Sequence, residues 1–427
     1  MRWLVGKFEP ETIFLWLYGD AGAGKSSICQ TFAVKCAQEQ RLLASFFFWR
    51  NDPRRSSHTS LMATLIHQAV AAIPDLRTLV AAAIDRDPSI FQKHLERQIV
   101  SLLVEPINEL VSTPELDQSS LPALILIDGL DECASTAGQC EILEAFSKAL
   151  SRCRLGLKIL IASRSEVDIM AAFNSNPLSH LSTRIALNAS FCPDEDMRKF
   201  LDATFEAIKS THPLKAYIPP SWPSSDVIPT LVERSSGQFI FVSTIGKYVS
   251  DRDQKPTEQL EIIMALRPTP TDTNMPYMEL NALYTHVLSR VPPHKIEKAL
   301  DILSFILVVR PRLLENQFLP SIADSLLGRY SETTDRTSHH DALLSLLCLE
   351  PGDIVFYLAN LSSLIEVDNN NSHGNMPNIR ISHASLGDFL LDRHRSHKFY
   401  CNPQKFFGKV LCICLKHSNR TSDGVCH

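Results

Sequence analysis

The chain lacks two features that mark large classes of protein. Its longest apolar runs, such as Leu124–Ile127 and Phe305–Val309, fall far short of the roughly 18 residues that a membrane-spanning helix needs. It also has no excess of positive charge, because 42 Lys and Arg stand against 47 Asp and Glu, for a formal net charge of -5. Nucleic-acid binding depends mainly on clusters of Lys and Arg side chains. We therefore expect a protein that binds neither membranes nor nucleic acids.

The sequence is also without an export signal and without a disulfide framework. Its start, MRWLVGKFEPETIFLWLYG, is interrupted by Lys7, Glu9 and Glu11, so it has no continuous apolar region of the kind that signal peptides carry. The 11 cysteines are odd in number and contain no CxxC pair. This pattern favours reduced thiols and a cytoplasmic location.

Up to about residue 190, short β-rich runs alternate with longer helical patterns, which is typical of a parallel sheet with crossover helices. The expected strands are Ile13–Tyr18, Ala44–Trp49, Ala123–Asp128, Leu157–Ala162 and Arg184–Leu187. The expected helices are Ser26–Gln38, Ser60–Ile73, Phe91–Leu110 and Cys140–Ser151. The first four strands are hydrophobic almost throughout, as in strands covered on both faces. The sequence predicts a doubly wound α/β domain over residues 1–190.

After residue 190 the β signal stops and a helical region is expected over residues 191–285. It starts with the amphipathic MRKFLDATFEAIKS, which follows an acidic first turn. Further helical patterns cover Asp226–Glu233, Phe239–Ser250, Glu279–Val291 and Lys295–Val309. The Pro-rich segments Ile218–Pro223 and Arg267–Pro276 mark breaks between helices.

A hairpin signal appears near the end of the chain. The β-like runs Leu364–Asp368 and Ile379–His383 flank the polar segment NNNSHGNMPN, and a helical pattern over Ser385–Asp392 follows. Helices, a hairpin and a further helix together predict a winged-helix-like domain over residues 286–400, while residues 401–427 form a tail without an assigned fold. Because the last helix carries Asp388 and Asp392, we do not expect it to recognise DNA.

The strongest motif is the octapeptide Gly19-Asp20-Ala21-Gly22-Ala23-Gly24-Lys25-Ser26, which matches GxxxxGK[ST] and lies between an expected strand and an expected helix. The glycines let the backbone curl so that successive N–H groups point at phosphate oxygens, and the helix adds the positive end of its dipole. Lys25 would reach the β- and γ-phosphates, and Ser26 would offer a hydroxyl to Mg²⁺. Together with Ser27, these residues form the expected nucleotide-binding set. The simpler alternative is a Gly-rich turn with an incidental lysine.

A second motif, LILIDGLDEC, places acidic residues at the end of an apolar strand, where a doubly wound sheet presents its ligands. Asp128 is the expected Walker B acid, which holds the metal through water. Asp131 and Glu132 could orient or deprotonate the attacking water, and the sequence leaves open which of them does so. The strand LKILIAS ends at Arg164, whose guanidinium could contact the γ-phosphate or, alternatively, be a solvated loop arginine.

These residues give the chain a resemblance to the NACHT domains of the STAND class of P-loop NTPases, in particular those of fungal NLR-like proteins. The resemblance is carried by WLYGDAGAGKSSICQTFA, SFFFWRNDPRR, LILIDGLDEC and LIASRSE, and farther along by SSGQFIFVSTI, PYMELNALYTHVL and ISHASLGDFLLD. It implies a switch in which ADP is held between the nucleotide domain, a helical lid and a winged-helix domain. It also implies that His383 contacts the β-phosphate; without the family, His383 reads as a histidine at a hairpin-to-helix junction. Relatives of this kind usually carry an effector domain and a repeat array, and this sequence shows neither pattern.

The function expected from the sequence is therefore an ATP/ADP-binding signalling switch that uses Mg²⁺. Exchange of the nucleotide would control conformation and assembly into a homo-oligomer, with slow or no hydrolysis and with protein partners. The alternative is a turnover ATPase of the AAA+ kind. A small-molecule kinase is disfavoured because more than 200 residues follow the nucleotide domain.

Overall fold

The computed structural model describes residues 3, 12–50, 52–113, 117–187, 193–267, 277–309, 347, 349–368 and 378–422. The chain divides into two compact units, Met1–Phe191 and Cys192–His427. The expected hairpin loop at 369–377 and most of the expected break at 267–276 lie outside the described residues.

The first unit is built on a five-stranded parallel sheet with the strand order β2-β3-β4-β1-β5. The strands are β1 (Phe14–Tyr18), β2 (Leu42–Phe47), β3 (Leu124–Asp128), β4 (Lys158–Ser163) and β5 (Ser182–Ala186). In the register of the sheet, Tyr18 of β1 lies opposite Ser163 of β4, and Asp128 of β3 lies opposite Ala162 of β4. The carboxyl ends of β1, β4 and β3 are therefore level and adjacent.

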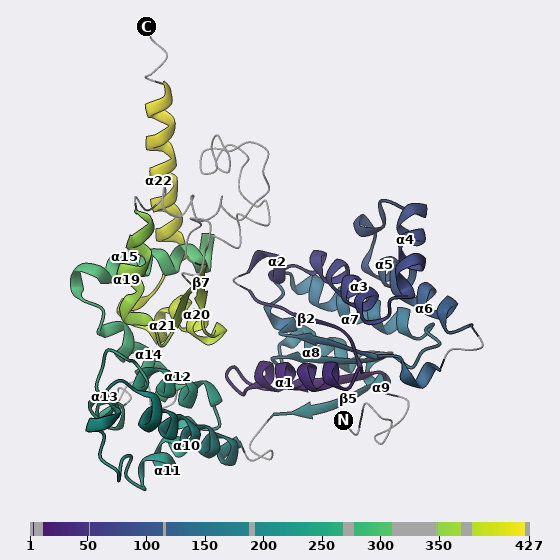
Figure 1. Ribbon diagram of the computed structural model, residues 1–427. Coiled ribbons are helices and arrows are strands. Elements are labelled where there is room, and N and C mark those ends of the chain that lie inside the picture. The colour runs from purple at the N-terminus through teal and green to yellow at the C-terminus, as the bar shows by residue number, and fades with distance from the viewer. Residues whose placement is uncertain are drawn as a thin grey trace. The chain divides into compact units, whose positions relative to one another are not determined.

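Helices cover both faces of this sheet, because side chains along each strand alternate between two apolar layers. Phe14 and Trp16 of β1 enter one core, while Leu15 and Leu17 enter the other. Helix α1 (Lys25–Gln38) packs on the second face through Cys29 and other small buried residues, and α3 (Leu61–Ala72) and α7 (Thr136–Leu150) cover the first (Figure 1). The predicted doubly wound α/β sheet is confirmed.

In chain order, the remaining helices of the first unit lie between β2 and β3 or between β4 and β5. They are α2 (Pro53–Ser56), α4 (Leu76–Arg86), α5 (Leu95–Ile99), α6 (Glu105–Leu110), α8 (Val167–Asn174) and α9 (Leu178–Leu181). Helices α2, α4, α8 and α9 are absent from the sequence predictions; α2 and α9 have only four residues each, too few to show an apolar period. Strand β2 begins and ends two residues earlier than predicted.

The helix predicted over Phe91–Leu110 is present over Leu95–Leu110, but it begins four residues later than predicted and is not α-helical throughout. After a 3₁₀ turn at Ile90–Gln92, the segment consists of α5, a π-helical stretch at Val100–Val104 and α6. Pro106 explains part of the difference, because proline has no N–H to donate to the carbonyl four residues earlier. The N–H of Glu105 instead donates to the carbonyl of Val100, which is the longer spacing of a π-helix.

The second unit is helical and has one contiguous apolar core. Among the described residues, its helices before the hairpin are α10 (Pro193–Thr211), α11 (Val227–Ser235), α12 (Phe239–Val249), α13 (Pro256–Ala265), α14 (Met278–Ser289), α15 (Pro293–Ser304) and α19 (Pro351–Leu358). The predicted hairpin is present as the antiparallel pair β6 (Ile365–Asp368) and β7 (Asn378–Ile381), followed by α20 (Ala384–Leu391) and α21 (Arg393–Ser396). The expected helical region after the sheet is confirmed, while the winged-helix-like domain over residues 286–400 stays a prediction. The division near residue 285 stays a prediction, since side chains before and after it enter the same core.

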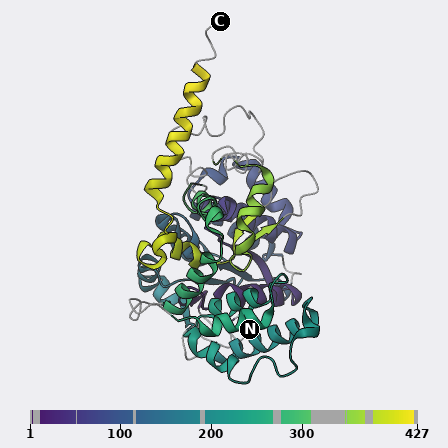
Figure 2. The same ribbon diagram turned by 90° about the vertical axis from the view of Figure 1, so that its left-hand side faces the viewer.

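The tail beyond residue 400 has more structure than the sequence suggested. Residues Pro403–Ser422 form helix α22, which extends away from the other helices of its unit (Figure 1 and Figure 2). Phe406 and Val410 anchor its first turns in the apolar core, and Lys409 pairs with Asp301 of α15. Within the described parts of the chain, no helix combines the length and apolarity required to cross a bilayer.

A partly buried arginine joins three helices of the second unit. Arg234 of α11 binds the Glu279 carboxylate of α14 through Nε at 3.0 Å and Nη2 at 2.7 Å. Its guanidinium also donates to the carbonyl oxygens of Ile263 at 2.9 Å and Leu266 at 3.0 Å, at the end of α13. This one side chain satisfies carbonyls that a helix end leaves without partners and neutralises a half-buried carboxylate.

We expect Arg234→Ala to destabilise the second unit by about 2 to 4 kcal/mol, because removing one partner leaves the other charge without compensation. Urea unfolding followed by circular dichroism would measure the loss. The matched control is Lys247→Ala, which breaks the exposed pair with Glu366 and should cost less than about 1 kcal/mol. Equal losses in the two variants would show that the Arg234 contacts contribute nothing special.

Candidate nucleotide-binding site

The segment from Gly19 to Gly24 forms the loop between β1 and α1, and Lys25 and Ser26 begin α1, so the motif lies between a strand and a helix as predicted. Gly22 and Gly24 have positive φ angles of 82° and 89°, which L side chains rarely adopt. Gly19 has a different requirement, since a Cβ there would lie 2.8 Å from the carbonyl oxygen of Leu187. The glycines thus allow both the curl of the loop and its close approach to the segment after β5.

Lys25 begins α1 and folds back over the loop. Its Nζ donates to the carbonyl oxygens of Gly19 at 2.7 Å and Asp20 at 2.8 Å. Burial lowers the pKa of Lys25, and the charge of Asp131 opposes that shift. Of the other predicted nucleotide-binding residues, Ser26 and Ser27 are exposed in the first turn of α1, Asp20 is exposed in the loop, and Ala21 and Ala23 are partly exposed.

Asp128 lies buried at the end of β3, facing the first turns of α1. Burial raises its pKa, while hydrogen bonds from Ser26 and Cys29 act in the opposite direction. Its Oδ1 atom is buried and has no hydrogen-bond partner among the described residues. A carboxylate oxygen in this state, next to a serine hydroxyl, fits a divalent cation with hard oxygen ligands such as Mg²⁺.

Three neighbouring strands thus bring the predicted groups to one edge of the sheet: β1 carries the phosphate loop, β3 ends at Asp128, and β4 lies between them and leads into Arg164. The first unit has the fold of a P-loop NTPase. In such a fold, ligands bind at the carboxyl ends of the parallel strands, at the point where successive connections lead to opposite sides of the sheet. Here that point is at β1, because the chain passes from β1 to β2 at one edge of the sheet, while β5 lies on the other side of β1.

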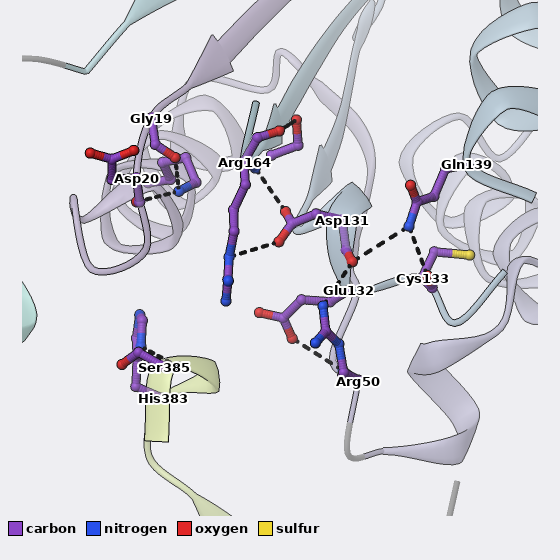
Figure 3. A network of polar contacts seen from close by, with 12 residues as sticks. Gly19, Asp20, Arg50, Asp131, Glu132, Cys133, Gln139, Arg164, His383 and Ser385 are labelled. Atoms are coloured by element: carbon purple, nitrogen blue, oxygen red, sulfur yellow. Dashed lines mark hydrogen bonds and ion pairs between the residues drawn. The ribbon is translucent and has the colours of Figure 1, made fainter. Parts of the chain in front are cut away.

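Arg164 is held by Asp131 in this P-loop NTPase fold. The Arg164 backbone N–H donates to Asp131 Oδ1 at 2.9 Å, and its Nε lies 3.1 Å from Oδ2. The Asp131 side chain is only 4% exposed, and that of Arg164 is 20% exposed. Figure 3 shows the Arg164 side chain between the phosphate loop and the acidic turn, Leu130–Glu132, which carries Asp131. The alternative of a solvated loop arginine is therefore not what the structure shows.

Glu132, the neighbour of Asp131, has a different environment. It is partly exposed, and its Oε2 accepts a hydrogen bond from the Arg50 backbone N–H at 3.1 Å. Burial, together with the charge of Asp131, raises the pKa of Glu132 to about 7. A carboxyl group that changes protonation near neutral pH has the property required of a general base.

Three residues contribute to this site that sequence reasoning did not identify: Cys29, Arg50 and Gln139. Cys29 lies one helical turn after Ser26, so the period of the helix could have found it. Arg50 follows β2 and donates from Nη2 to the Asp131 carbonyl oxygen at 3.2 Å. Gln139 of α7 donates to the Cys133 carbonyl oxygen at 2.9 Å and is buried. Arg50 carries no local signal, because the turn that it contacts lies 81 residues later in the sequence. Gln139 lies only eight residues after Asp131, but its contact depends on how the turn leads into α7.

His383, the remaining predicted site residue, belongs to the second unit. It precedes α20, and its Nδ1 accepts a hydrogen bond from the Ser385 backbone N–H at 3.1 Å (Figure 3). Ser385 Oγ lies 2.7 Å from the same nitrogen and 2.8 Å from the buried hydroxyl of Tyr284. The histidine therefore has the structural role of capping this helix, and its contact with a nucleotide stays a prediction.

A comparison with known protein families finds a match within the first unit. The family model described as nephrocystin 3, N-terminal, matches residues 2–164, which include the phosphate loop, the acidic turn and Arg164. No curated protein matches the chain.

Among solved structures, a Walker-type ATPase of Pyrococcus abyssi is 14% identical, with 90% of this chain and 93% of that chain covered at a TM-score of 0.38. The structure of Drosophila ORC bound to DNA is 12% identical, with 88% of this chain and 90% of that chain covered at a TM-score of 0.37. Likenesses this weak carry no conclusion, so the fold rests on the sheet and loop described above.

Proposed function

We propose that this protein is an ATP/ADP-binding signalling switch of the NACHT class within the STAND group. In this proposal, exchange of the nucleotide controls conformation and self-association, and hydrolysis is slow or absent. The observation that carries the proposal is the convergence of the phosphate loop, buried Asp128 and the Asp131–Arg164 pair at one edge of the sheet. The sequence resemblance to NACHT proteins supports the finer assignment.

The residues of the loop would bind the phosphates first. Backbone N–H groups at the start of α1 favour negative charge, and Lys25 would exchange the carbonyl oxygens of Gly19 and Asp20 for phosphate oxygens. Ser26 and Asp128 would hold Mg²⁺, which neutralises charge on the bound phosphates. Adenine as the base follows from the resemblance, because the loop reads only phosphates.

The environment of the two adjacent acids supports Glu132 rather than Asp131 as the group that deprotonates water. Both Asp131 oxygens are bound to Arg164, whereas Glu132 is partly exposed and has a pKa raised to about 7. The same observation favours the second candidate function, a turnover ATPase of the AAA+ kind. The two candidates differ in the rate of ATP hydrolysis. A switch would hydrolyse ATP far more slowly than it exchanges bound nucleotide for nucleotide in solution.

His383 would link the nucleotide to the second unit. Because Nδ1 accepts the Ser385 N–H, a neutral His383 carries its proton on Nε2, which makes that atom a donor for a phosphate oxygen. We also propose a cytoplasmic protein with protein partners and without nucleic-acid or membrane binding. The net charge of -5 supports the exclusion of nucleic acid.

The switch proposal predicts that the state of assembly depends on the nucleotide. Size-exclusion chromatography with light scattering should show a larger species with Mg²⁺ and a non-hydrolysable ATP analogue than with ADP. The physical reason is that only a ligand with different affinities for two states can shift their populations. The same mass with ADP, with the analogue and with neither would overturn the switch and leave the turnover ATPase.

A further inference from the structure

We infer that the side chain of Gln68 closes the outer edge of β2 against a second copy of this chain. Strand β2 stands at one end of the strand order, so among the described residues no strand pairs with its outer side. Backbone N–H and C=O groups along such an edge are a template for a strand from another chain. The inference concerns this edge of the sheet and does not depend on the proposed nucleotide site.

The segment that includes β2 is well suited to pair with a copy of itself. Residues 42–48 read LLASFFF, seven residues that include three phenylalanines and contain no charge, proline or glycine. Short segments with high β-propensity, low net charge and no proline are those that stack with identical segments of other chains. The partner that this edge fits is therefore the same strand of a second copy.

Charged residues oppose such pairing only at the two ends of the segment. Arg41 precedes it and Arg50 follows one residue after it, and no charged residue lies between them. Charges that flank an apolar strand disfavour its stacking, but they leave its middle open. Protection of the middle of β2 therefore has to come from another element.

Gln68 of α3 provides this protection at Ser45, in the middle of the strand. The Gln68 Oε1 atom accepts a hydrogen bond from the Ser45 backbone N–H at 2.8 Å, and Nε2 donates to the Ser45 carbonyl oxygen at 2.9 Å. A side-chain amide offers one acceptor and one donor group, as the backbone of a neighbouring strand does. Helix α3 packs against β2 (Figure 1), so the amide reaches the strand from a fixed support.

The two hydrogen bonds use both backbone groups of Ser45. Ser45 and Gln68 are both partly buried, so the amide satisfies groups that have limited access to water. A strand from a second copy could bind these groups only after the Gln68 amide had left them. Gln68 thus satisfies this part of the edge and occupies it at the same time.

The test measures self-association of variants by size-exclusion chromatography with light scattering, over a range of protein concentrations and with ADP in every sample. Gln68→Met keeps the length of the side chain but can form neither hydrogen bond. We expect its mass to rise to two or more chains at concentrations at which the wild-type mass does not change. In the dilute variant, the Ser45 amide should exchange its hydrogen at least about tenfold faster than in wild type, because it has lost its acceptor.

Hydrogen exchange of the Ser45 amide, followed by mass spectrometry, also identifies the surface that associates. If β2 pairs with a second copy, the Ser45 amide gains a new acceptor, so its exchange in Gln68→Met should slow again as the protein concentration rises. Association through another surface would leave this amide exchanging as fast as in the dilute variant. That result would overturn the inference.

Two controls separate closure of the edge from a general loss of stability. Gln68→Glu also gives up the bond to the Ser45 carbonyl oxygen, but it adds a charge that opposes a second strand, so it should not associate. His67→Ala changes an exposed neighbour on α3 and should behave as wild type. The inference is wrong if Gln68→Glu associates as readily as Gln68→Met, or if Gln68→Met keeps the wild-type mass at every concentration. Gln68→Ala, which also forms neither bond, carries the same test if Gln68→Met does not fold.

Discussion

Replacing Lys25 with alanine is expected to abolish nucleotide binding. The Lys25 ammonium is held over the phosphate loop by the carbonyl oxygens of Gly19 and Asp20, and no other side chain of the loop carries a positive charge. Loss of two charge-assisted contacts to phosphate should weaken binding at least about a hundredfold, or about 3 kcal/mol.

The measurement is to purify the protein gently, denature it and identify released nucleotide by ion-exchange chromatography. The switch proposal expects nearly one ADP per native chain and little in Lys25→Ala. The matched control is Lys35→Ala, which removes an exposed lysine from the last turn of the same helix and should retain the nucleotide. Equal nucleotide content in wild type and Lys25→Ala would show that the loop does not bind phosphate.

Replacing Glu132 with glutamine should reduce ATP hydrolysis by about two to four orders of magnitude while leaving nucleotide affinity nearly unchanged. The amide keeps the size of the side chain and its contact with the Arg50 N–H, but it cannot accept a proton from water. A steady-state phosphate-release assay measures this loss. Wild-type hydrolysis at a rate equal to that of the variant would refute Glu132 as the base.

The pKa of Glu132, raised to about 7, also predicts a dependence on pH. The deprotonated, active form accumulates as pH rises through 7, so wild-type hydrolysis should increase from about pH 6 to about pH 8. Stability should change in the opposite sense. The folded state holds this proton more tightly than the unfolded state, so the contribution of Glu132 to stability is present at low pH and is lost as pH rises through 7. Glu132→Gln should therefore gain stability relative to wild type at pH 8 and not at pH 4, as thermal melting at the two pH values would show.

Much of the first unit could be predicted from sequence because its signals are local. An apolar strand, a glycine-rich loop and a helix follow one another directly around Lys25, and Asp128 ends a run of buried residues. The failures have equally definite causes. Pro106 alters the hydrogen bonding of a segment that otherwise reads as one helix, and the anchor residues Phe406 and Val410 of α22 need a core contributed by distant helices.

The sequence by itself determined the loop between β1 and α1, the place of Asp128 at the end of β3, the α/β class and the helical character of the second unit, since backbone conformation and apolar period depend on neighbouring residues. Only the tertiary structure decided that the two adjacent acids of the acidic turn have different surroundings. Asp131 and Glu132 are adjacent in the chain, but Asp131 meets Arg164 from the next strand and Glu132 meets the backbone of Arg50. The chemistry of a carboxylate depends on which groups the fold brings to it, and those groups come from segments that no local pattern connects.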